Sequence, residues 1–251
     1  MFNYKKNYKI IATGKVSLRA IENVGAEKLF SKNYLLIDKI WEKKSKKKNG
    51  KLFDKNLLNF VSYNKKGRKI NIIAHFFKYK NYLAQSLEKK LNLGIRLVGV
   101  SGIIILRDKK SDYVVFAQRS NNVTEYPGFI ELVPSGSIDD ENVDIKGGVD
   151  FKSKLLSEFT EETGLPKHYV KDITSFAFVL DTDHNVYDIC CRILLKVKKD
   201  TVFKKFIKSE EYGKPIFIDV RNLNKFIEKK YVAIVPTSLA IINAYSRLKF
   251  K

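Results

Sequence analysis

The stretch of sequence that decides the fold is Ser157-Glu158-Phe159-Thr160-Glu161-Glu162-Thr163-Gly164-Leu165. In a helix, Glu158, Glu161 and Glu162 occupy positions i, i+3 and i+4, so their carboxylates share one face. The apolar residues among and before them point to another side, where they can pack against a sheet. Crowded like charges destabilise a helix by roughly a few tenths of a kcal/mol per pair, and a hard divalent cation offsets that repulsion. We therefore predict a helix over residues 151–163 whose acidic face binds a metal ion, with a solvated acidic face as the alternative.

A glycine loop precedes this helix. The segment Phe129–Val133 is typical of a strand, and it stops at Pro134-Ser135-Gly136. Because glycine has no side chain, the backbone at Gly136 can come close to a ligand, and its carbonyl can join a metal's ligand shell. Strand, glycine loop and glutamate-bearing helix make a coherent site, in which we expect Ser135 and Gly136 to contact the substrate.

The rest of the chain predicts a mixture of strands and helices. Hydrophobic periodicity, turn residues and helix stops indicate helices over 34–41, 82–93, 151–163 and 236–248. The same signals indicate strands over 8–13, 57–63, 70–77, 97–106, 113–118, 129–133, 175–180, 189–197 and 216–220. This order favours an α+β fold in which helices cover both faces of a mixed sheet. The pattern changes near residue 95, so we expect a smaller α+β N-terminal domain over 1–95 that packs on a catalytic domain over 96–251.

Composition narrows the class of protein. The chain has 251 residues, of which 44% are hydrophobic, which is enough for a packed core and excludes collagen-like and low-complexity chains. Its apolar runs fall far short of the roughly 20 residues that cross a bilayer. The two cysteines, Cys190 and Cys191, are neighbours in an apolar run, which argues against a disulfide framework and makes the cytoplasm the expected location.

Lysine dominates the charge. The chain has 48 basic and 27 acidic residues, a formal net charge of +21, which indicates an anionic partner such as nucleic acid or a phosphorylated metabolite. Only eight of the basic residues are arginine, the residue that planar recognition of nucleic acid favours. The run Lys43–Lys48 is expected to be a solvated turn. We therefore expect a small-molecule partner, with nucleic acid as the alternative and no membrane.

The segment Glu158–Leu165 resembles the second half of the signature of the Nudix hydrolases, G-x5-E-x7-R-E-U-x-E-E-x-G-U, in which U is apolar. It matches E-U-x-E-E-x-G-U at every defined position. The resemblance implies a Nudix sandwich for residues 96–251 and an enzyme that hydrolyses a nucleoside diphosphate linked to another group. It also implies that Glu158, Glu161 and Glu162 hold Mg²⁺, or alternatively Mn²⁺, together with the carbonyl of Gly136.

Three departures from the signature are visible. Seven extra residues lie between Gly136 and the helix, Ser157 stands where the signature has arginine, and Val149 stands where it has the upstream glutamate. Asp150 can supply the missing acid, although a helix N-cap is an equally good role for it. Without the arginine, a metal-binding glutamate needs another partner.

The departures resemble one branch of the family. Together with the runs Leu97–Gly102, Val115–Val123 and Tyr126–Gly128, they are similar to the UDP-glucose and UDP-sugar pyrophosphatases. That similarity implies Mg²⁺-dependent hydrolysis of UDP-glucose or UDP-galactose to UMP and sugar 1-phosphate.

Other residues are candidates for contacts with the substrate. Glu211, or its neighbour Glu210, precedes the strand over 216–220, where several Nudix branches carry a loop acid that takes a proton from water. Arg119 resembles the basic residue that contacts phosphate in the family. Tyr82, in Tyr79-Lys80-Asn81-Tyr82, offers an aromatic face for a base at the start of a helix.

Two alternative functions remain. The net charge is typical of an enzyme acting on an RNA 5′ cap, and the signature half-motif is shared by hydrolases of ADP-ribose and of dinucleotides. Ser157 and Val149, which depart from the signature, support instead a catalytically weak module that binds a nucleotide or RNA.

Overall fold

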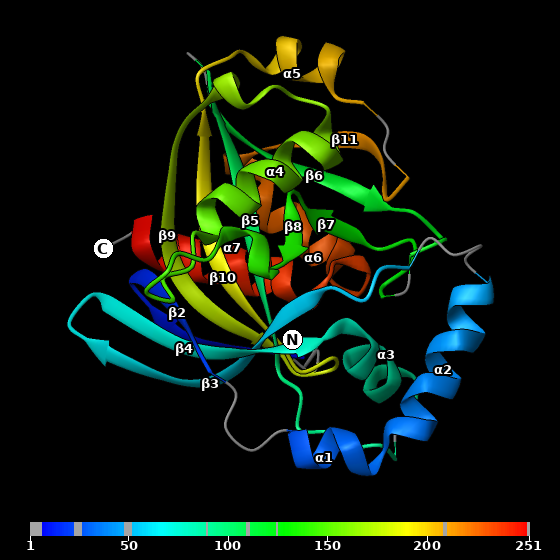
Figure 1. Ribbon diagram of the computed structural model, residues 1–251. Coiled ribbons are helices and arrows are strands. Elements are labelled where there is room, and N and C mark those ends of the chain that lie inside the picture. Colours follow the sequence, from blue (N-terminus) through cyan, green and yellow to red (C-terminus); the bar gives the residue numbers. More distant parts are fainter. Residues whose placement is uncertain are drawn as a thin grey trace.

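The computed structural model describes residues 7–22, 27–47, 52–88, 90–108, 111–123, 125–207 and 210–249. It has an eleven-stranded mixed sheet with helices on both faces (Figure 1), so the predicted α+β class is confirmed. The strands are β1 (Tyr8–Thr13), β2 (Lys15–Ile21), β3 (Asn56–Lys66), β4 (Lys69–Lys78), β5 (Leu97–Arg107), β6 (Asp112–Arg119), β7 (Ile130–Leu132), β8 (Ser135–Ser137), β9 (Val170–Asp181), β10 (Val186–Leu195) and β11 (Tyr212–Asp219). The helices are α1 (Glu27–Lys32), α2 (Tyr34–Lys47), α3 (Tyr79–Leu87), α4 (Phe151–Thr163), α5 (Lys199–Lys205), α6 (Leu223–Lys230) and α7 (Pro236–Lys249).

Strand β5 is the centre of the sheet. Ten of its eleven residues are buried, because it is an apolar run covered on both faces. On one side it pairs in parallel with β10. On the other side its partner changes from β8, opposite Gly99–Ser101, to β6, opposite Ile105–Arg107. This change of partner brings the glycine loop of β8 beside the middle of the sheet.

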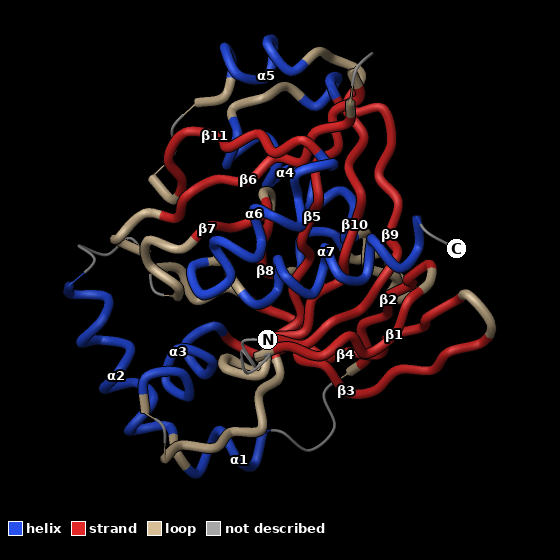
Figure 2. Tube along the Cα trace, turned by 180° about the vertical axis from the view of Figure 1, so that it is seen from behind, coloured by secondary structure: helices blue, strands red, loops and turns tan. Residues whose placement is uncertain are grey.

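Helices α4 and α7 cover opposite faces of β5 (Figures 1 and 2). Side chains alternate along a strand, so Val98 and Ile104 point to the face where Phe159 of α4 packs, whereas Ile103 points to the face where Leu239 of α7 packs. The apolar side of α4 is thus fixed against the sheet. Its glutamates are left to face the loop that ends at β8.

The two ends of α4 are capped by the residues that the sequence suggests. The carboxylate of Asp150 accepts a hydrogen bond from the backbone N–H of Ser153 at 3.1 Å and from its hydroxyl at 2.6 Å. Gly164 ends the helix in the left-handed conformation, with φ at 67°. Asp150 therefore serves as the N-cap, and its neighbour Val149 is buried in the core.

The elements before residue 95 extend the same sheet. Strand β1 pairs with β9, and Asn59 of β3 pairs with Leu97 of β5. Apolar side chains of β2, β3 and β4 belong to the same core cluster as those of β5 and α4. The division of the chain near residue 95 stays a prediction; the two parts share a sheet and a core.

Several local predictions differ from the structure. The helix predicted over 82–93 is α3, which ends at Leu87, and α1, α5, α6 and β8 were not predicted. Strand β2 was not expected: it is short, and of its four apolar residues only Val16 and Leu18 are buried. Strands β3 and β4 extend further than predicted and are joined at Gly67-Arg68. The lysine run was predicted as a turn, but α2 continues through Lys47, and Lys48 lies outside the described residues. Within the described residues, no helix is long and apolar enough to cross a membrane.

Candidate active site

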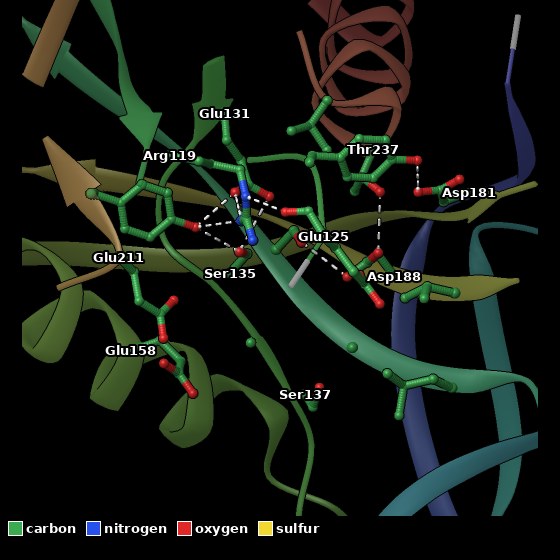
Figure 3. A pocket seen from close by; sticks show the side chains of 18 residues that line it. Arg119, Glu125, Glu131, Ser135, Ser137, Glu158, Asp181, Asp188, Glu211 and Thr237 are labelled. Atoms are coloured by element: carbon green, nitrogen blue, oxygen red, sulfur yellow. Dashed lines mark hydrogen bonds and ion pairs between the residues drawn. The ribbon is translucent and has the colours of Figure 1, made fainter. Parts of the chain in front are cut away.

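A cavity of about 310 Å³ opens where β5 changes partner (Figure 3). Strands β5 to β11 form its walls together with α4, α7 and Glu211, which directly precedes β11. Its charged lining is almost entirely acidic, with Arg119 as the one basic residue among those described. The acidic residues of the lining are Glu125, Glu131, Glu158, Asp181, Asp188 and Glu211.

The predicted glycine loop and glutamate helix meet in this cavity. A Cβ atom added at Gly136 would lie 2.4 Å from Oε1 of Glu158, so only glycine leaves room for this carboxylate. Burial raises the pKa of Glu158, against the lowering effect of Lys154, whose ammonium lies 2.9 Å from Oε1. Twenty-two positions of sequence therefore separate two groups that touch in the fold.

The three predicted metal ligands differ in their surroundings. Glu162 is 4% exposed, and the backbone N–H of Ser135 donates to both of its carboxylate oxygens at 3.3 Å. Burial, and then the charges of Glu158 and Glu131, raise its pKa well above the ordinary value. Glu161 is exposed and does not line the cavity.

A buried polar network forms the wall opposite α4. Arg119 donates through Nη1 to Glu131 and, at 3.1 Å, to the hydroxyl of Tyr212. That hydroxyl donates in turn to Oε2 of Glu131 at 2.7 Å. Burial lowers the pKa of Arg119, but the charge and hydrogen bond of Glu131, together with Tyr212 and Glu211, raise it by more in total, so the guanidinium stays charged. Ser135 joins the network with a hydroxyl 3.4 Å from Oε1 of Glu131.

The far end of the cavity holds two buried aspartates, Asp188 and Asp181 (Figure 3). Asp188 accepts hydrogen bonds from the hydroxyls of Ser101 at 2.9 Å and Thr237 at 3.4 Å. Burial raises the pKa of Asp188 to about 7. Asp181 accepts a hydrogen bond from the hydroxyl of Tyr126 at 2.7 Å, and burial raises its pKa as well.

Glu211 and Tyr82, both predicted from sequence, lie on the edge of this cavity or beside it. Glu211 lines it next to Glu158 (Figure 3). A second cavity of about 790 Å³ shares Arg119, Glu125 and Glu211 with the first. Tyr82 lines the second cavity, and its hydroxyl donates to Glu125. Glu210 lines the second cavity but not the first.

Sequence reasoning missed Glu131, Asp188 and Tyr212. Glu131 is a lone carboxylate inside the apolar run Phe129–Val133, and that isolation is a signal which could have marked it. Asp188 interrupts an apolar strand in the same way. Tyr212 carries no such local signal, because its partners come from β6 and β7.

The donors suit a hard divalent cation, although they do not already form a metal cluster. Within the described ranges, no three acidic, histidine or cysteine side chains converge closely enough to hold a metal ion. Yet Glu158 offers carboxylate oxygens next to Gly136, where there is no room for a Cβ atom, and Glu162 offers its own next to the backbone of Ser135. Hard oxygen donors of this kind are the ones that Mg²⁺ and Mn²⁺ prefer.

Comparison with known proteins gives a partial backbone likeness. No family model matches the sequence, and no curated protein matches it. A protein of Deinococcus radiodurans aligns with a TM-score of 0.44 and 8% identity over 59% of this chain and 83% of its own.

Two further solved structures are similar to this chain at a comparable level. The Nudix domain of NrtR from Shewanella oneidensis, solved with ADP-ribose, aligns with a TM-score of 0.40 and 16% identity over 68% of this chain and 99% of its own. A bifunctional NMN adenylyltransferase/ADP-ribose pyrophosphatase from Francisella tularensis gives a TM-score of 0.43 and 12% identity over 65% of this chain. This chain spans about half of the Francisella enzyme, 47% of its length. The functional proposal therefore rests on the residues of the cavity.

Proposed function

We propose that this protein is a Nudix-type hydrolase that splits the diphosphate of a nucleoside diphosphate sugar. Its substrates would be UDP-glucose or UDP-galactose, and its products UMP and sugar 1-phosphate. The observation that carries the proposal is the contact between Gly136 and Glu158, because two separated parts of the signature resemblance meet where a Cβ atom has no room.

The charge of the cavity supports a requirement for metal ions. Six carboxylates and one arginine line it, in a protein whose formal net charge is +21. A diphosphate would be repelled by this lining unless divalent cations accompanied it. Glu158, Glu162 and the carbonyl of Gly136 would hold Mg²⁺ or Mn²⁺, with Glu161 as a further ligand. A bound cation of this kind would neutralise the charge that develops on the phosphoryl oxygens.

The other residues of the cavity would orient the substrate and move a proton. Water attacks a phosphorus atom of the diphosphate, and the bond from that phosphorus to its leaving oxygen breaks. Glu211 would accept the proton of the attacking water, since it lines the cavity beside Glu158. Arg119, held in place by Glu131 and Tyr212, would donate to a phosphate oxygen.

The second cavity suits the nucleoside. Tyr79 and Tyr82 of α3 line it from the part of the chain before residue 95, and Ser120 and Asn122 line it from beyond β6. The rings of Tyr79 and Tyr82 stack with centroids 6.4 Å apart and offer an aromatic wall to a base. Residues 1–95 would therefore complete the substrate site.

The test is a substrate panel with product identification. UDP-glucose, UDP-galactose, ADP-ribose, dinucleoside polyphosphates and capped RNA are each incubated with the protein and Mg²⁺ at equal concentrations. We expect the UDP-sugars to be cleaved fastest. Faster cleavage of capped RNA, which the net charge favours as the second candidate, would replace the UDP-sugar assignment. Absence of turnover on every substrate would favour a module that only binds nucleotides.

A further inference from the structure

Lys154 lies one helical turn before Glu158 and contacts two carboxylates. Its ammonium is 2.9 Å from Oε1 of Glu158 and 3.1 Å from Oδ2 of Asp139. The side chain of Lys154 is 14% exposed and that of Asp139 is 2% exposed, so this ion pair is largely shielded from water. Removing one partner of an ion pair this well buried leaves the other charge uncompensated, which costs more than the same change on the surface.

Asp139 belongs to the same loop as Gly136. It follows Gly136 by three residues, and its carboxylate also accepts the backbone N–H of Glu141 at 3.3 Å, which fixes it at the start of a short 3₁₀ turn. Lys154 therefore links the glycine loop to the glutamate of α4. Ser157, directly before Glu158, carries no charge that could take this role.

Without a cation beside it, the carboxylate of Glu158 would face repulsion from several sides. Glu161 and Glu211 both act to raise its pKa, so their negative charges disfavour its ionised form. Lys154 opposes this effect at Oε1. A carboxylate has two oxygens and about four lone pairs, so one N–H donor leaves it able to bind a metal ion as well.

We propose that Lys154, anchored by Asp139, is the positioning residue that holds the Glu158 carboxylate against Gly136 for metal binding. This inference rests on the proposed function, because it assumes that Glu158 is a metal ligand. In this chain a lysine four residues upstream would do what the missing arginine of the signature would otherwise do. An ammonium that instead occupied the cation's own place would compete with metal binding.

Mn²⁺ binding to the full-length protein, measured by calorimetry without substrate, tests this role. Lys154→Met should weaken Mn²⁺ binding by about tenfold or more, as loss of residues that orient metal ligands usually does. Lys154→Arg should restore binding to within about threefold, because it keeps the charge beside Glu158. Lys55→Met is the matched control: Lys55 also contacts Asp139, at 3.4 Å, but it is 48% exposed, and its loss should leave Mn²⁺ affinity within about twofold.

The possible results separate the two proposals. Unchanged or tighter Mn²⁺ binding by folded Lys154→Met would overturn the positioning role and show that the lysine competes with the cation. If that variant does not fold, Asp139→Asn repeats the test, since it removes the anchor but keeps its size; unchanged affinity there would also overturn the role. A wild-type protein that binds no Mn²⁺ would overturn the proposed function and this assignment with it.

A separate observation concerns the outer face of β2, β4 and β3. Lys69 of β4 is paired with Lys15 of β2 on one side and with Lys66 of β3 on the other. Directly opposed residues in a sheet point to the same side, so these three exposed lysines form a row across three strands. Like charges directly opposite each other destabilise a sheet, so an anionic partner would relieve this row.

The rows beside the lysine row are also free of acidic residues. The next row is Asn64, Asn71 and Ser17, and the third is Ser62, Ile73 and Arg19. Every residue of these two rows is exposed except Ile73, which is half-buried. The opposite face of the same strands belongs to the core, so this outer face is the one left for a partner. Cations flanked by amides and hydroxyls complement a phosphate backbone, whereas insertion into a membrane needs exposed apolar side chains.

We infer that this lysine face, Lys15, Lys66 and Lys69 with their polar neighbours, docks single-stranded nucleic acid through its phosphates. The inference goes beyond the proposed hydrolase and does not depend on it. Binding would be sequence-independent and would fall steeply with salt, because each neutralised phosphate releases counterions.

Fluorescence anisotropy with a single-stranded RNA, measured over a range of salt concentrations, tests this face. Replacing Lys15, Lys66 and Lys69 together by Gln should weaken binding and reduce the slope of log K against log salt by about two, at about 0.7 per phosphate. The matched control replaces Lys225, Lys229 and Lys230, which are exposed on α6, so that the net charge changes equally. Equal losses in both triple variants, or no RNA binding by the wild type, would overturn the inference. Loss of binding to anionic vesicles, with RNA binding intact, would assign the face to a membrane surface and contradict it.

Discussion

Glu131 is the carboxylate around which one wall of the cavity is built. It is 7% exposed and receives hydrogen bonds from Arg119, Tyr212 and Ser135. A buried ion pair gains little over apolar packing, but removal of one partner leaves the other charge without compensation. The network therefore fixes the position of the Arg119 guanidinium, and removal of this side chain should destabilise the folded protein.

Removal of the Arg119 charge should expose this dependence. We expect Arg119→Met to lower the free energy of unfolding by about 3 kcal/mol, because Glu131 is left buried without a counter-ion. Arg192→Met is the control, since Arg192 pairs with Asp172 in a half-exposed position and should cost under about 1 kcal/mol. Urea denaturation measures both variants. Equal losses would mean that the Glu131 network does not stabilise the fold.

Asp188 should make stability depend on pH in an unusual direction. Burial raises its pKa from 3.8 to about 7, so between these values the folded protein binds a proton that the unfolded chain has released. Its contribution to stability is therefore largest in acid and is lost as the pH rises through 7. Relative to Asp188→Asn, which does not titrate, the wild type should lose up to about 4 kcal/mol of unfolding free energy between pH 4 and pH 8. If the unfolding free energies of the two proteins changed in parallel with pH, Asp188 would not hold a proton in the folded protein, and the prediction would be wrong.

At the scale of elements, the cavity depends on how α4 meets the short strand β8. The apolar side of α4 is packed on the sheet, so the distance from its glutamates to Gly136 is set by the core and not by β8. Strand β8 has a glycine, Gly136, at this point, because a side chain there would collide with Glu158 where it now lies. The packing of α4 against the sheet therefore makes a glycine necessary at position 136 if Glu158 is to keep its place in the site.

Gly136→Ala should therefore displace Glu158 with little change in the fold. The added Cβ would lie 2.4 Å from Oε1, and we expect turnover and Mn²⁺ affinity to fall by about tenfold or more, since misplacement of about 1 Å can cost 100-fold. Gly213→Ala is the control, because its Cβ would meet its nearest atom at 3.7 Å. Steady-state kinetics and calorimetry measure both variants. If Gly136→Ala kept the wild-type turnover and Mn²⁺ affinity, the contact between Gly136 and Glu158 would not matter for the site.

The helices and strands predicted from sequence matched the structure best where an apolar pattern extends over many residues. The pattern predicted α4, β5 and α7 closely, because each carries a long apolar run or stripe that packing then uses. It missed β8, whose three residues, Ser135–Ser137, contain no apolar side chain and pair with β5 only in the folded sheet. Short strands of this kind depend on their partners and leave no local signal.

At the scale of the whole molecule, the charge is distributed unevenly. A chain with a formal net charge of +21 places six carboxylates around one cavity. Glu158, Glu211 and Gly136 could be predicted from sequence as candidates, because the signature resemblance marks them. The roles of Glu131 and Asp188 could not, since their partners lie on other elements: Arg119 and Tyr212, which both contact Glu131, are 93 residues apart in the chain. For Lys154 the spacing to Glu158 is visible in the sequence, but its anchor Asp139 is not.

The shared sheet predicts that the two parts of the chain depend on each other. Deletion of residues 1–95 would remove β1 from β9 and uncover core side chains that Val16, Leu58 and Ile72 now contact. We expect the fragment over 96–251 to be insoluble or unfolded, as judged by circular dichroism and urea denaturation, because it loses part of its core. A soluble fragment that cleaved UDP-glucose with an unchanged KM would contradict both this dependence and the composite substrate site.

The central claim is that a metal-dependent site built on α4 splits a nucleotide diphosphate, and phosphorus-31 NMR tests it most directly. UDP-glucose is incubated with Mg²⁺ and either the wild type or Glu162→Gln, which keeps the size of the buried side chain but removes its charge. The account predicts that the wild type converts the diphosphate resonances into those of UMP and glucose 1-phosphate in equal amounts, and that Glu162→Gln, while still folded, leaves the diphosphate intact. Cleavage by Glu162→Gln at the wild-type rate, or an intact diphosphate after incubation with the wild type, would contradict it.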